Sequence, residues 1–153
     1  MVIARHDPCA WLPEGGLAEV VWANGSAVPH PTPVARILVT EGDAILAVER
    51  DDGRGLDIPT AAVTSDLRST LEELVSSVLG DGEAALRLLG FVRNTVPAAP
   101  GSYPWPRPIA HFAVWHCRVG DGARHCGRWL DGDEAQAHLG ERHWWPLVGY
   151  VEA

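Results

Sequence analysis

A short segment near the middle of the chain carries side chains that could perform acid–base chemistry or bind a metal ion. Two adjacent glutamates are followed, after two intervening residues, by two adjacent serines (Glu72, Glu73, Ser76, Ser77). A carboxylate can act as a general acid or base, and carboxylate oxygens are the ligands that magnesium prefers. Serine hydroxyls carry no charge to offset the desolvation of such an ion. The segment therefore favours proton transfer by a carboxylate over a magnesium cluster.

Two histidines supply the second set of candidate catalytic groups. His111 and His116 bracket an apolar stretch that reads as a strand. Residues five apart on a strand point to opposite faces, so the two imidazoles cannot share a metal ion unless the strand is bulged. We predict that Glu73 and whichever histidine faces the pocket divide proton donation and abstraction between them. The alternative is that each histidine is a partly buried, hydrogen-bonded strand residue.

The three cysteines do not form a recognisable metal motif. Cys117 shares the strand face of His111, but a separation of six residues is about 20 Å along a strand, too far for one ion. His125 and Cys126 are adjacent and point to opposite faces. A zinc site is therefore open only to residues that the fold brings together. The odd number of cysteines, which includes Cys9, suggests reduced thiols and a cytoplasmic location.

Aromatic side chains provide the candidate binding surface. The chain has seven tryptophans, and the proline-rich segment 97–108 carries two aromatic residues in a rigid loop or lid. Pockets for small molecules are commonly walled by aromatic groups with a few polar ones. The predicted substrate-binding residues are Tyr103, Trp105, Trp115, Arg50 and Arg93, in a pocket between the 66–79 helix, the long strand and the 97–108 loop. Core packing is the alternative role for at least half of the aromatics.

The pattern of apolar residues predicts one α/β (α+β) domain over 1–153, with a helical and turn-rich extension at 1–33 and a core at 34–151. A helix at 66–79 buries a stripe formed by Leu67, Leu71, Leu74, Val75 and Val78. The long strand, 109–119, is apolar on both faces and is expected to be central. The remaining predicted elements are a helical approach at 9–23, a hairpin at 34–50, strands at 56–58, 86–93 and 124–130, a helix at 133–139 and an extended segment at 144–151.

The order of these elements resembles the Nudix hydrolase family. The resemblance rests on the hairpin ending at Glu49-Arg50, the Ile58-Pro59 approach to the helix, the strand at 89–92 and the segment 142–147. It implies an α/β/α sandwich with a mixed sheet. Aligned on the Nudix motif, Glu73 retains the first helix glutamate, whereas the following glutamate pair is replaced by serines and the Gly-Gly pair by Thr60-Ala61. The resemblance therefore implies the fold without the family's magnesium-dependent diphosphate hydrolysis, and no divalent metal is expected at this helix.

Charge and composition restrict the partners. The net charge is −8 and every basic residue is arginine, so the positive surface that nucleic acid or an anionic membrane requires is missing. No signal peptide or membrane-spanning run is present. The lack of lysine, with abundant alanine, glycine and arginine, is typical of a high-GC bacterial genome.

These observations predict a divergent Nudix-fold enzyme that acts on a small, partly apolar or aromatic metabolite, without a cofactor, in bacterial specialised metabolism. One alternative is a catalytically silent module that binds a small molecule. Another is a weak nucleoside-diphosphate-type hydrolase that uses Asp66, Glu72 and Glu73. A homodimer is left open.

Overall fold

A computed structural model describes residues 1–80 and 84–152 and shows a mixed sheet. The strands follow the spatial order β1-β2-β7-β8-β3-β4-β5, with β6 paired to β3 and β9 paired to β4. Only the β3–β8 pair is parallel among the strand pairs of the described residues. The strands are β1 (Val2–His6), β2 (Leu17–Trp22), β3 (Val34–Glu41), β4 (Ala44–Glu49), β5 (Leu56–Asp57), β6 (Thr60–Ala62), β7 (Arg87–Thr95), β8 (Ile109–Arg118) and β9 (Arg128–Leu130).

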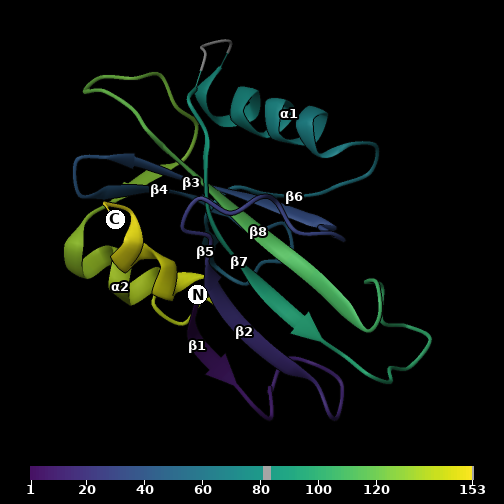
Figure 1. Cartoon of the computed structure of the whole chain (residues 1–153). Coiled ribbons are helices and arrows are strands. Elements are labelled where there is room, and N and C mark those ends of the chain that lie inside the picture. Colours follow the sequence, from purple (N-terminus) through teal and green to yellow (C-terminus); the bar gives the residue numbers. More distant parts are fainter. Residues whose placement is uncertain (81–83, 153) are drawn as a thin grey trace.

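Helices cover both faces of this sheet (Figure 1). Helix α1 (Leu67–Leu79) packs on one face, which we call the α1 face. Helix α2 (Gly132–Leu139) and the 3-10 helix η1 (Trp145–Tyr150) pack on the other, which we call the α2 face. This arrangement is the predicted α/β/α sandwich with a mixed sheet. No helix in the described part of the chain is long and apolar enough to cross a membrane.

Local sequence explains where α1 begins and ends. The side chain of Asp66 caps the first turn by accepting a hydrogen bond from the backbone N–H of Ser69 at 2.8 Å. Gly80, with φ of +75°, ends the helix. Between them, the predicted stripe faces the sheet: Leu74, Val75 and Val78 are buried, and Leu67 and Leu71 are half-buried against the same core. The prediction for this helix is confirmed.

The helical prediction at 9–23 is wrong. Residues 17–22 form β2, which lies between β1 and β7, so the first 33 residues contribute two strands to the sheet. The spacing of the apolar residues in this segment fits both a helix and a strand. In the structure, β-branched Val20 and Val21 pair with Val92 and Phe91 of β7. Tertiary pairing therefore decides the conformation, and the 1–33 segment is part of the sheet instead of an extension to it.

The last predicted segment also differs from the structure. Residues 145–150 form η1 in place of an extended segment, with Pro146 in its first turn, where a missing N–H costs nothing. The strand expected at 124–130 is limited to 128–130. The hairpin, the helix at 133–139 and the central position of β8 agree with the prediction. The β8 strand is central because β7 and β3 pair with its two edges.

Candidate functional site

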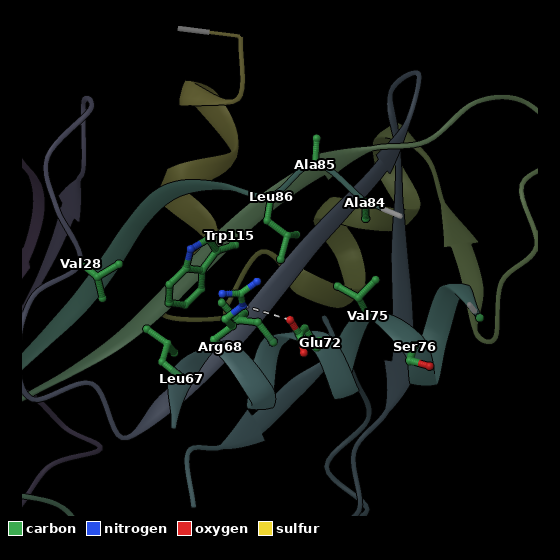
Figure 2. A pocket seen from close by; sticks show the side chains of 12 residues that line it. Val28, Leu67, Arg68, Glu72, Val75, Ser76, Ala84, Ala85, Leu86 and Trp115 are labelled. Atoms are coloured by element: carbon green, nitrogen blue, oxygen red, sulfur yellow. Dashed lines mark hydrogen bonds and ion pairs between the residues drawn. The ribbon is translucent and has the colours of Figure 1, made fainter. Parts of the chain in front are cut away.

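An open groove of about 890 Å³ runs along one flank of α1 (Figure 2). Its walls come from α1, from Trp115 of β8, from the chain just before β7 and from the connector that follows β2. In Figure 2 the side chains of Trp115, Leu67 and Leu86 turn toward the same space. The apolar side chains that border the groove include Val28, Leu67, Leu71, Val75, Leu86 and Trp115.

Two periodicities place these side chains together. On α1, Leu71 and Val75 lie four residues apart, so both project from the same flank of the helix. On β8, alternate residues share a face, which puts Trp115 beside Ala113 and Cys117 on the α1 face. Trp115 is 5% exposed and forms part of the groove wall that the sheet provides. Of the aromatic residues predicted to bind substrate, Trp115 is the one that borders this groove.

Few of the side chains that the structure describes at the groove are polar. Arg68 and Glu72 form an ion pair along α1, with the guanidinium Nε 3.2 Å from the carboxylate Oε1 (Figure 2). Both side chains are largely exposed, so the pair contributes little to stability. Ser76 adds a hydroxyl at the same rim. The groove thus offers an apolar surface with a polar edge.

The three predicted acid–base residues are not brought together. Glu73 is exposed and lies about 100° further round the helix than Glu72, and it does not border the groove. His111 and His116 point to opposite faces of β8, as the parity argument predicted, because His116 shares its side of the strand with Val114 and His111 shares its side with Trp115. Neither histidine borders the groove.

Each histidine already has a hydrogen-bond partner. His111 Nδ1 donates to the carbonyl oxygen of Pro31 at 2.8 Å, and its ring lies edge-on to Phe91. His116 Nε2 lies 2.8 Å from Thr40 Oγ1. Burial lowers the pKa of both imidazoles below the ordinary histidine value. Both imidazoles therefore fit the alternative role of neutral strand residues that are packed and hydrogen-bonded.

The other predicted binding residues lie elsewhere. Arg93 donates two hydrogen bonds to Glu19 on the neighbouring strand β2. Trp105 packs edge-on against Phe112, with ring centroids 5.3 Å apart. Phe112 belongs to the α2 face and Trp115 to the α1 face, so the 97–108 loop does not wall the groove as predicted. The hydroxyl of Tyr103 in this loop is buried without a partner among the described residues.

Arg50 lies at a second, smaller cavity, which sequence reasoning missed. This cavity is bordered by Arg36 and Asp57 together with Arg50, and its volume is about 340 Å³. The signal was present in the sequence: Arg36 is a charged residue within the apolar strand β3, and Asp57 lies between Leu56 and Ile58. Burying a charge in such a position costs free energy unless specific partners compensate it.

Within residues 1–80 and 84–152, no group of three or more histidine, cysteine, aspartate or glutamate side chains is arranged to hold a metal ion. Cys9 and Cys117 are buried free thiols and Cys126 is an exposed one. Burial raises the pKa of Cys117 to about 11. A thiol with such a high pKa is a poor nucleophile near neutral pH.

Comparison with known proteins gives similarities to solved structures alone. No family model matches the chain, and no curated protein matches it. A mutant of the Bacillus subtilis pyrophosphohydrolase BsRppH is similar in structure, with 11% sequence identity and a TM-score of 0.49 over 78% of this chain. The chain spans 65% of the length of that structure. A similarity at this level carries no information about activity, so a functional assignment must come from the residues of this chain.

Proposed function

We propose that this Nudix-fold protein binds a small, largely apolar or aromatic molecule in the groove beside α1. The observation that carries the proposal is the groove itself, about 890 Å³ and walled mainly by aliphatic side chains and Trp115. Binding sites for small molecules typically span about 300–1,000 Å³ and are apolar with a few polar groups. A ligand with an apolar body would contact Leu71 and Trp115, and a polar substituent would reach Arg68, Glu72 or Ser76 at the rim.

The placement of the acid–base candidates supports binding over turnover. A general acid or base must lie within hydrogen-bond reach of the proton that it transfers. Glu73 projects away from the groove, and the imidazoles of His111 and His116 are engaged elsewhere. Among the described residues the rim offers one carboxylate, Glu72, which is paired with Arg68, whereas magnesium binds several oxygen ligands, carboxylates prominent among them. For hydrolysis or acid–base catalysis in the groove, these carboxylate and imidazole groups would have to move to within reach of the bound molecule.

Two leucines on α1 provide a matched test of the binding site. Leu71 and Leu79 are both half-buried against the same core, but only Leu71 borders the groove. The probe is 1-aminoanthracene, a neutral aromatic whose fluorescence rises in an apolar site. We expect Leu71→Asn to weaken its binding by about tenfold, or about 1.4 kcal/mol. Leu79→Asn should leave binding within about twofold of the parent. Equal effects of the two variants would place the probe outside the groove.

A second measurement separates a binding protein from an enzyme. The chain is incubated with a nucleoside diphosphate derivative, with and without magnesium, and release of phosphate or nucleoside monophosphate is followed. The proposal expects no release above the uncatalysed background. Release that disappears in Glu73→Gln, but persists in Leu71→Asn, would assign hydrolysis to this fold and overturn the binding role.

A further inference from the structure

Arg36 is a half-buried arginine without a carboxylate partner. It lies in the middle of β3 on the α2 face, because it shares its side of the strand with Leu38. Its Nε is buried and has no hydrogen-bond partner, and within the described part of the chain no carboxylate lies within ion-pair distance of its guanidinium. The guanidinium lies 5.5 Å from the ring centroid of Phe112. Burial, as the main cause, lowers the pKa of Arg36.

The nearest buried carboxylate, Asp57, is already fully engaged. Its Oδ1 accepts hydrogen bonds from the backbone N–H of Ile58 at 2.8 Å and from Trp144 Nε1 at 2.9 Å. Its Oδ2 accepts from Arg50 at 3.3 Å and lies 3.9 Å from Arg142 Nε. Asp57 is 4% exposed. Arg50 donates a hydrogen bond to this buried carboxylate and Arg142 lies within ion-pair distance of it, whereas Arg36 does neither.

Arg36 borders the cavity of about 340 Å³ at this position. Thr60 lies beside it, because the two residues are paired across the β3–β6 ladder and therefore share a face of the sheet. Arg50 and Ile58 form further walls. The rim also carries acidic side chains, which are the exposed or partly exposed Glu49, Asp51 and Asp52.

The charge pattern selects the kind of ligand. An unpaired guanidinium is a strong donor to a carboxylate or a phosphate oxygen. Asp52 is bonded to Arg50, but Glu49 and Asp51 leave uncompensated negative charge at the entrance. A doubly charged phosphate is repelled by these carboxylates more strongly than a singly charged group is. The volume, near the lower limit for ligand sites, suits a molecule of a few heavy atoms.

We propose that this cavity binds the carboxylate of a small organic acid, with Arg36 as the residue that recognises it. The carboxylate supplies the charge and hydrogen-bond partner that Arg36 lacks among the residues the structure describes. Arg50 is held in place by Asp52 and Asp57 and adds a second positive charge at the wall. The site lies on the α2 face and is independent of the groove beside α1.

The test uses propionate as the probe and the Nε–H signals of arginine in nuclear magnetic resonance spectra as the readout. The signal that disappears in Arg36→Met identifies Arg36. We expect millimolar propionate to shift this signal, with propionamide, its neutral analogue, causing no shift. Arg36→Met should weaken propionate binding at least about tenfold. Removing a partly buried charge without a partner should leave the melting temperature unchanged or raise it.

Arg93→Met is the matched control, because Arg93 is also half-buried but is paired with Glu19 away from the cavity. This variant should bind propionate like the parent. The proposal fails if propionate leaves the Arg36 signal unmoved, if Arg36→Met binds propionate as tightly as the parent, or if inorganic phosphate binds more tightly than propionate. Leu71→Asn should not change propionate binding, so this result is separable from that for the α1 groove.

Discussion

The two faces of the sheet differ in how completely helices cover them and in whether they bury charged side chains. On the α1 face, a single helix of 13 residues covers the strands with aliphatic side chains and leaves an open groove along one flank. On the α2 face, α2 and η1 close over the strands, and Trp144 and Leu147 are almost completely buried. This second face also contains the buried carboxylate of Asp57 with its arginines.

The difference shows how polarity and openness are linked. An apolar surface that is left open can be completed by any ligand of suitable shape, because dispersion and hydrophobic contacts are not directional. A buried charge must find specific partners, since an unpaired one costs several kcal/mol. The α1 face is therefore suited to an apolar ligand of loosely defined shape. The α2 face, with Arg36 lacking a partner, is suited to a ligand of defined charge.

The largest effect on stability should come from the charged network of the α2 face. Asp57→Asn removes the buried negative charge that lies between Arg50 and Arg142, so that Arg142 has no carboxylate within ion-pair distance among the described residues. We expect a loss of about 3–5 kcal/mol in the free energy of unfolding, measured by urea denaturation. The control is Asp52→Asn, which removes an exposed partner of Arg50 and should have a much smaller effect. Equal losses in the two variants would contradict the central role of Asp57.

A cavity on the α1 face should have the next largest effect. Leu74 is 8% exposed and packs against the sheet from the middle of α1. Leu74→Ala should cost about 2–4 kcal/mol in the free energy of unfolding, because the packed core cannot fully close around the void. Leu71→Ala, at the half-buried edge of the groove, should cost less. If Leu71→Ala were the more damaging of the two, the groove would be part of the closed core.

The smallest of the three effects should depend on pH and belongs to the α2 face. Burial, together with the charge of Arg36, lowers the pKa of His143 to about 4, against an ordinary value of 6.5. Between these values the unfolded chain binds the proton and the folded chain does not, so unfolding is favoured as the pH falls. The contribution is complete above pH 6.5 and is lost as the pH falls toward 4. With the partial exposure of the ring discounted, the loss should be about 1–2 kcal/mol.

The variant His143→Phe isolates this effect. His143 stacks on Trp11 with ring centroids 3.8 Å apart, and phenylalanine preserves an aromatic ring at that position. Melting temperatures are compared at several pH values for the parent and the variant. The decline below pH 6.5 should be shallower in the variant, which lacks the titrating imidazole. Parallel curves for the two proteins would show that His143 does not titrate in this range.

Residue periodicity predicted the elements that depend on local contacts. The hairpin at 34–50 follows from Gly42 and Asp43 between two apolar runs, and the 66–79 helix follows from its stripe and its Asp66 cap. The alternation of side chains along a strand correctly placed His111 and His116 on opposite faces of the sheet. The segment at 9–23 was mispredicted because its apolar spacing suits both a helix and a strand, and the choice depends on pairing with β7, which is about 70 residues away in the chain.

The sequence by itself therefore determined the mixed α/β (α+β) class, the buried stripe of α1 and the presence of uncharged serines at positions 76 and 77. These properties depend on side-chain type and on spacing within one element. The tertiary structure decided which residues share a site. It placed Trp115 on the α1 face and Trp105 against the α2 face, and it brought Arg36 near Asp57 from a separate strand. Such groupings depend on which strands pair and on which face each helix packs, and these relations join residues that no local spacing connects.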